Sequence, residues 1–369
     1  MNANTDALDN RDPVVVQNAL SRRRKTPRDL ALLLSPGAGE MLPQIAEHAR
    51  RIALERVGRA ILLYAPLYLS NRCVGGCPYC GFRANRRIER RVLGLEEIGR
   101  EAAQLERLGI KHVLLVAGDD PKRVDVEYLA SAIRALRWVV PSVSVEVAPL
   151  ETDGYRALVE AGADGVTLYQ ETYDSVVYKA MHDRGPKADY DYRLVALDRA
   201  GQAGVRKLTA GVLWGLAPWR QDALRLGLHL LQLQRSWWRS TVSFGVPRLR
   251  WVPDDFEIPH PFDERSLIHV MVALRAFLGD VGVALSTRES AELRDGMVAL
   301  GVTQMSAGSR TEPGGYSDPG AAGDQFEVSD TRSPAEVADA LRGLGYDPVW
   351  KDWDRGLGPE QTAIGGERD

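Results

Sequence analysis

Residues 111–118 read KHVLLVAG, and this stretch decides the fold class. It is a run of aliphatic residues closed by glycine, which is typical of a strand buried on both faces. The segments on either side, LEEIGREAAQLERLGI at 95–110 and VEYLASAIRALRWVV at 126–140, carry apolar residues at helical spacing. A buried strand between two amphipathic helices predicts one parallel unit of strand and helix.

The same alternation continues in both directions from this stretch. Further strands are predicted at 61–70, 142–149, 164–172, 207–215, 240–249 and 281–287. Helices are predicted between them at 154–163, 192–204, 222–236 and 264–279. Six to eight such units over ~250 residues favour an α/β fold of the TIM-barrel type, with a full set of eight strands, over an open doubly wound sheet, which remains the alternative.

The predicted barrel occupies residues 61–310 and has an extension at each end. Residues 1–60 form an N-terminal helical extension, in which Thr26 caps a helix that begins at Pro27. Residues 311–369 form a glycine-rich loop and a helix that cover the barrel, and Ser333 with Glu336 makes a capping box there.

Composition excludes several classes of function. Of 369 residues, 44% are hydrophobic and 26% are charged, and 47 basic against 50 acidic residues give a formal net charge of −3. That balance predicts neither nucleic acid nor an anionic membrane as a partner. No apolar run is long enough to span a membrane, and the polar N-terminus lacks a signal-peptide pattern, so a cytoplasmic location is expected.

The chain has three cysteines, Cys73, Cys77 and Cys80, in the segment NRCVGGCPYCGF directly after the first predicted barrel strand. An odd, clustered set is not a disulfide framework and indicates a metal or catalytic site. Three thiolates on one short loop suit three irons of a four-iron cluster, whose fourth iron is left to bind a small molecule. The alternative is a zinc-binding scaffold without catalysis, but structural zinc needs a fourth ligand, and no histidine follows within 30 residues.

The cysteine segment and several others resemble the radical S-adenosylmethionine superfamily. Within it the chain resembles the aromatic amino acid lyases, most closely the tyrosine lyases of thiamine biosynthesis, known as 2-iminoacetate synthases. The resemblance covers nearly the whole chain. Its segments are LYAPLYLSNRCVGGCPYCGF, LLVAGDD, VEVAPL, YQETYD, LDRAGQAG, GVLWGL, VPRLR, LSTRES, SAGSRTEPGGYS and PVWKDWD, and the last two are the most specific.

The resemblance implies which residues bind each cofactor and the substrate. Cys73, Cys77 and Cys80 would hold one 4Fe–4S cluster per chain. S-adenosylmethionine would contact Tyr79, Gly118, Asp119, Glu146, Glu171, Arg193 and Gly215. The amino acid substrate would contact Tyr68, Arg248, Arg250, Arg288 and Ser306.

Some of these assignments have competing interpretations. Tyr68 and Tyr79 also suit simple packing, and Arg193 also suits an exposed helix face. Asp119 stands where relatives usually carry glutamate, so its backbone is the better candidate for contact. Gly245 stands where relatives usually carry serine, so a contact from that serine to the phenol would be missing, or would be supplied by Ser243 or by water.

The resemblance implies a lyase that cleaves the Cα–Cβ bond of L-tyrosine. The products would be 2-iminoacetate, p-cresol, 5′-deoxyadenosine and methionine, with thiazole synthase as receiver and a flavodoxin or ferredoxin as electron donor. A related maturase that makes carbon monoxide and cyanide needs further C-terminal cysteines, and residues 81–369 contain none. Action on tryptophan or another aromatic substrate remains the alternative.

Overall fold

The predicted barrel is confirmed by a computed structural model that describes residues 5–250, 252–253, 255–320 and 322–351. Eight parallel strands run in the order β2-β3-β4-β5-β6-β7-β8-β1, and β1 also pairs with β2, so the sheet closes on itself. The open doubly wound sheet is thereby excluded. The strands are β1 (Ala60–Ser70), β2 (His112–Ala117), β3 (Ser142–Glu146), β4 (Gly165–Glu171), β5 (Lys207–Val212), β6 (Thr241–Gly245), β7 (Gly282–Leu285) and β8 (Gln304–Ser306).

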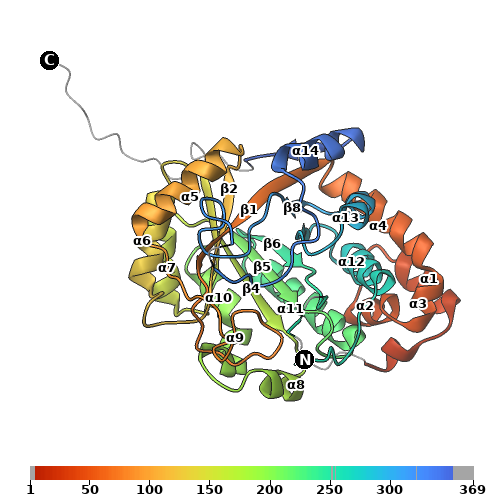
Figure 1. The fold of residues 1–369 in the computed structure, drawn as a ribbon. Coiled ribbons are helices and arrows are strands. Elements are labelled where there is room, and N and C mark those ends of the chain that lie inside the picture. Colours follow the sequence, from red (N-terminus) through yellow and green to blue (C-terminus); the bar gives the residue numbers. More distant parts are fainter. Residues whose placement is uncertain (1–4, 251, 254, 321, 352–369) are drawn as a thin grey trace.

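Helices surround the barrel, as Figure 1 shows. Apolar strand residues that face outward pack against these helices in one continuous core. The helices that follow the strands are α5 (Leu95–Arg107), α6 (Val126–Leu136), α7 (Thr152–Ala161), α8 (Ser175–Met181), α9 (Tyr190–Leu194), α10 (Ala196–Gln202), α11 (Trp219–Ser236), α12 (Glu264–Leu278) and α13 (Ala291–Val298), with a short 3-10 turn η2 (Pro186–Ala188) before α9.

The N-terminal residues form helices that pack beside the barrel (Figure 1). They are η1 (Thr5–Asp9), α1 (Pro13–Ser21), α2 (Pro27–Leu33), α3 (Pro36–Glu40) and α4 (Leu42–Arg56). The predicted start of α2 is confirmed, because the Thr26 side chain accepts from the Asp29 amide while Asp29 accepts from the Thr26 amide. Helix α4 also contacts α12, so the extension is part of the same packed unit.

Several elements differ from the sequence prediction. The helix predicted at 192–204 is two helices, α9 and α10, separated at Val195. Strand β8 has only three residues, and a ninth strand, β9 (Asp347–Val349), pairs with the first residues of β1 outside the closed ring. Pro348 is tolerated there because β9 is an edge strand. The predicted capping box at Ser333 is confirmed at the start of α14 (Pro334–Gly343).

The carboxyl ends of all eight strands meet at one end of the barrel, which is where active sites of this fold lie. The three cysteines follow β1, so they lie at this end. The glycine-rich loop after β8, in blue in Figure 1, crosses in front of the strands. Of the helices in the described residues, none combines the length and apolar character needed to cross a membrane.

Candidate active site

The cysteine loop is folded tightly at the mouth of the barrel. A Cβ atom placed on Gly75 would lie 3.4 Å from Cys73 Sγ and 3.7 Å from Cys77 Sγ, so both sulfurs face the same point of the loop. The amide of Gly75 donates to Cys73 Sγ, and the amide of Phe82 donates to Cys80 Sγ, each at 3.4 Å. Burial raises the pKa of each thiol to about 11, so a bound metal cation would be needed to favour the thiolate form.

Arg90 holds the two ends of this loop together. Its guanidinium donates to the carbonyls of Asn71, Phe82, Arg83 and Arg86 at 2.6, 2.8, 2.6 and 3.0 Å. The loop is also bonded to the end of β2, where Val74 N donates to Asp119 O at 2.9 Å. Backbone carbonyls from both sides of the cysteine segment therefore converge on one arginine.

Gly118 and Tyr79 bring further groups against the cysteines. A Cβ atom on Gly118 would lie 2.3 Å from Arg72 O, so only glycine allows this approach. The Tyr79 hydroxyl lies 2.7 Å from His182 Nε2, while His182 Nδ1 lies 2.7 Å from Tyr178 O. Because a carbonyl only accepts, Nδ1 carries the proton and Nε2 accepts from Tyr79.

Glu171 has a strained backbone that aims its carboxylate into the mouth. It is the non-glycine residue with positive φ, 69°, in the described part of the chain, and the β4–β5 pairing is irregular between Tyr169 and Glu171. Lys187 Nζ lies 2.5 Å from Glu171 Oε1, and a terminal nitrogen of Arg193 lies 3.6 Å from the same oxygen. A strained residue that two cations hold in place is a feature of functional sites.

The electrostatics keep these groups charged although they are buried. Burial alone would raise the pKa of Glu171, but Lys187 and Arg193 lower it below its ordinary value. Arg193 is only 7% exposed, so it does not lie on an exposed helix face. The nearby Glu146, at the end of β3, differs: burial and the charge of Glu171 raise its pKa to about 7.

Arg288, Tyr68 and Ser306 stand at the ends of β7, β1 and β8. The Arg288 guanidinium lies 3.4 Å from the ring centroid of Phe326 and forms no ion pair with any described residue. The Tyr68 hydroxyl donates to Gln325 Oε1 at 2.6 Å. The Ser306 hydroxyl is buried and accepts from the Thr287 amide at 3.0 Å.

Arg248 and Arg250 have a different environment, because both contact Glu289. Arg248 binds that carboxylate with two nitrogens, at 2.7 and 2.6 Å, and Arg250 reaches it at 3.2 Å. Gly215, with φ +118°, lies against Leu249 in the same region. The guanidinium of Arg248 is therefore already satisfied by the protein, whereas that of Arg288 is available.

The loop after β8 closes over this mouth. A Cβ atom on Gly81 would lie 2.5 Å from the carbonyl oxygens of Asp324 and Gln325, so the loop packs directly on the cysteine segment. Glu312 fixes the loop by accepting from the amides of Gly320 and Ala322. We call residues 310–326 the covering loop, apart from residue 321, which lies outside the described residues, as do residues 352–354 of the PVWKDWD segment.

Sequence reasoning missed Lys187, Arg90, Gln325 and Phe326. Arg90 lies in a basic run, RRIERR, close to the cysteines, which was a usable signal. Lys187 follows Gly185 and Pro186 in a loop with no periodic pattern, and Phe326 follows a loop of glycine and proline. Only the folded chain brings these residues to the mouth.

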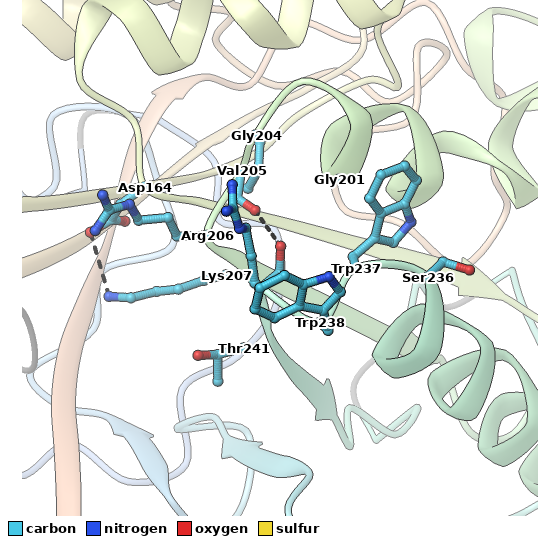
Figure 2. A pocket seen from close by; sticks show the side chains of 12 residues that line it. Asp164, Gly201, Gly204, Val205, Arg206, Lys207, Ser236, Trp237, Trp238 and Thr241 are labelled. Carbon is cyan, nitrogen blue, oxygen red and sulfur yellow. Dashed lines mark hydrogen bonds and ion pairs between the residues drawn. The ribbon is translucent and has the colours of Figure 1, made fainter. Parts of the chain in front are cut away.

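Other features of the described residues do not converge on this mouth. No three His, Cys, Asp or Glu side chains among them lie close enough to hold a single metal ion. A surface cavity of about 920 Å³ is lined by Asp164, Lys207 and Thr241, which lie at or next to the starts of β4, β5 and β6 (Figure 2). It is therefore at the opposite end of the barrel from the cysteines.

Comparison with known proteins agrees with this geometry. Residues 67–219 match the model of the radical SAM superfamily, and residues 245–347 match the biotin and thiamin synthesis associated domain. The chain is 41% identical to 2-iminoacetate synthase of Escherichia coli, over 93% of this chain and 91% of that protein. It is 40% identical to the 2-iminoacetate synthase of Salmonella typhimurium with the same coverage.

Solved structures agree as well. HydG, a maturase of the [FeFe]-hydrogenase, superimposes with a TM-score of 0.85 at 32% identity, covering 95% of this chain and 77% of that one. HydG from Carboxydothermus hydrogenoformans superimposes with a TM-score of 0.83 at 33% identity, covering 91% of this chain and 79% of that one. With a long match at this identity and a cysteine loop at the barrel mouth, the chain belongs to the 2-iminoacetate synthase family of the radical SAM superfamily.

Proposed function

We propose that the chain is a lyase that cleaves the Cα–Cβ bond of L-tyrosine to give 2-iminoacetate and p-cresol. The observation that carries this proposal is the 41% identity to a 2-iminoacetate synthase over 93% of the chain. The available arginine at the barrel mouth, Arg288, supports an amino acid as the substrate.

The radical SAM family implies a 4Fe–4S cluster and S-adenosylmethionine as cofactors. The cysteine loop fits a cluster, because two amides already point at its sulfurs and Arg90 fixes its backbone. When bound, these cofactors supply a 5′-deoxyadenosyl radical that takes one hydrogen atom from the substrate, at its amino group in this proposal. Cys73, Cys77 and Cys80 would hold one cluster per chain.

For S-adenosylmethionine, the chain offers a row of groups along the carboxyl ends of β2 to β5. Glu171 and Arg193 would bind its ribose or methionine portion, and Arg193 would form an ion pair with the carboxylate of the methionine portion. Lys187 would keep Glu171 ionised. Gly118 and the Asp119 backbone would contact the methionine amino group. Tyr79 would pack against the adenine, and Gly215 would let the adenine approach the backbone. Glu146 would also contact S-adenosylmethionine.

For the substrate, Arg288 would bind the tyrosine carboxylate through two parallel charge-assisted hydrogen bonds. Tyr68 and Ser306 would bond to the amino and carboxylate ends. Arg248 and Arg250 would act through Glu289, which precedes α13 and follows Arg288 directly, so they position the arginine clamp. Such fixed placement contributes to rate mainly through orientation.

The covering loop would keep water from the reacting groups. Removal of one hydrogen atom from tyrosine, followed by return of one electron and one proton, accounts for every atom of p-cresol and 2-iminoacetate. One electron is needed to cleave S-adenosylmethionine and this returned electron is the second, so the reaction requires an electron donor, of the flavodoxin or ferredoxin class. Because 2-iminoacetate hydrolyses in water, we propose that thiazole synthase receives it directly for thiazole formation in thiamine biosynthesis.

The test is anaerobic incubation of the reconstituted protein with S-adenosylmethionine, a reductant and either tyrosine or tryptophan. We expect p-cresol with tyrosine and no cleavage product with tryptophan. Turnover of tyrosine without p-cresol would refute the proposal, and cleavage of tryptophan alone would replace tyrosine by the alternative substrate.

A further inference from the structure

Tyr169 projects from β4 into the barrel, opposite two glycines. A Cβ atom on Gly245 of β6 would lie 2.4 Å from the Tyr169 hydroxyl oxygen. A Cβ atom on Gly211 of β5 would lie 2.4 Å from Cδ1 of the Tyr169 ring. Gly211 and Gly245 are register partners on neighbouring strands, so together they make the space that this side chain fills.

The height of Tyr169 in the barrel is set by its place on β4. Interior residues alternate along the strand, so Thr167 lies below Tyr169, and Glu171 lies above it at the mouth. Thr167 and Tyr169 both line an interior cavity of about 20 Å³, which is room for a single water molecule. Tyr169 therefore separates the mouth from the filled lower part of the barrel.

The hydroxyl of Tyr169 faces the groups that surround the proposed substrate. Burial, followed by the charge of Glu146 and the neighbouring Tyr64, raises its pKa well above the ordinary value, while Arg288 lowers it. The hydroxyl stays protonated and can donate. No hydrogen bond joins it to any described residue, and the side chain is only partly buried, so the hydroxyl is free to bond to a molecule in the mouth.

We propose that Tyr169 reads the phenol end of the substrate, by a hydrogen bond between its hydroxyl and the phenol hydroxyl of bound tyrosine. The inference rests on the proposed function, because it takes tyrosine as the substrate. With its carboxylate at Arg288 near the mouth, tyrosine extends its ring inward toward Tyr169. Gly245 has no side chain to offer a hydrogen bond and instead leaves the space in which the Tyr169 hydroxyl stands.

This arrangement selects tyrosine over phenylalanine. A site that hydrogen-bonds a substrate hydroxyl rejects the analogue that lacks it, since the protein group is then left unpaired. Tyr169 is a specificity residue, because it touches the substrate at a position remote from the bond that breaks.

The experiment measures equilibrium binding of tyrosine and of phenylalanine to the reconstituted holoenzyme with S-adenosylmethionine and no reductant. We expect Tyr169→Phe to raise the Kd for tyrosine about tenfold and to leave the Kd for phenylalanine within about twofold. Gly245→Ala, whose methyl group displaces the hydroxyl, should weaken tyrosine binding in the same direction. Tyr173→Phe is the matched control, because it removes a buried hydroxyl bonded to His229 on the outside of the barrel.

Two outcomes overturn the inference. The first is an unchanged ratio of the two Kd values in Tyr169→Phe. The second is a loss of discrimination between tyrosine and phenylalanine that occurs in Tyr64→Phe and not in Tyr169→Phe. Failure of the proposed function is separate: a wild-type enzyme that makes no p-cresol under reducing conditions refutes tyrosine cleavage. A wild-type enzyme that makes p-cresol while Tyr169→Phe binds both amino acids normally refutes only the role of Tyr169.

Discussion

Lys187 Nζ lies 2.5 Å from Glu171 Oε1, so a residue of an irregular loop holds the strained end of a barrel strand. Both side chains are buried, and removal of one partner of a buried ion pair leaves an uncompensated charge. The pair therefore links the backbone conformation of Glu171 to its proposed role with S-adenosylmethionine.

Lys187→Met should weaken binding of S-adenosylmethionine about tenfold, because Glu171 loses its nearest cation while Arg193 at 3.6 Å remains. Isothermal titration of the reconstituted protein measures this. The matched control is Lys179→Met, an exposed lysine on α8. Equal binding in the two variants would mean that Lys187 does not support the cofactor site.

Arg90→Ala should lower the iron and sulfide content of the anaerobically reconstituted protein to well below half of wild type. Four carbonyls on either side of the cysteines lose this donor, and a buried carbonyl left without any partner costs ~1–3 kcal/mol. Arg87→Ala, an exposed arginine three residues away, is the control and should keep a full cluster. A full cluster in Arg90→Ala would show that the loop holds its form without this arginine.

Arg288→Ala should raise the Kd for tyrosine by about a hundredfold, since charge-assisted hydrogen bonds contribute ~1.5–3 kcal/mol. The cluster should remain, because Arg288 makes no contact with the cysteine loop in the described residues. Arg239→Ala, an exposed arginine at the other end of the barrel, should bind tyrosine like wild type. Loss of iron from Arg288→Ala would instead give Arg288 a structural role.

Asp330→Asn should destabilise the protein by ~3 kcal/mol or more, because Asp330 pairs with the fully buried Arg294 and with Arg332. Burial alone would raise the pKa of Asp330, but the two arginines lower it below its ordinary value. The stabilisation is thus complete above pH ~4 and is lost as the pH falls through the lowered folded pKa.

Denaturant unfolding at several pH values tests this prediction. Over that range Asp330→Asn should lose less stability on acidification than wild type does, because the share contributed by Asp330 is gone. Asp339→Asn, whose carboxylate is exposed beside Arg342, is the control and should change stability by less than ~0.5 kcal/mol. A similar loss in both variants would contradict the role of the buried pair.

The fold was predictable because its signals are local. Apolar strands such as 111–118, helix caps at Thr26 and Ser333, and the tight cysteine spacing each depend on neighbouring residues. Strands β8 and β9 have three residues each, too few for a periodic pattern, and they form by pairing with other strands, β8 with β7 and β1, and β9 with β1.

The site was predictable only in part, because its contacts join distant segments. The left-handed backbone of Glu171 arises from an irregular strand pairing, and its partner Lys187 lies 16 residues further along the chain. Gln325 and Phe326 reach Tyr68 and Arg288 through the closure of the covering loop. Tertiary packing sets all of these, and their sequence neighbourhoods carry no mark of it.

The most direct test of the account is the yield of p-cresol relative to 5′-deoxyadenosine in a single anaerobic incubation of the reconstituted enzyme with tyrosine, S-adenosylmethionine and a reductant. Tyrosine cleavage predicts that the two products rise together in a ratio near one to one. Formation of 5′-deoxyadenosine that depends on tyrosine, with no p-cresol, would contradict it.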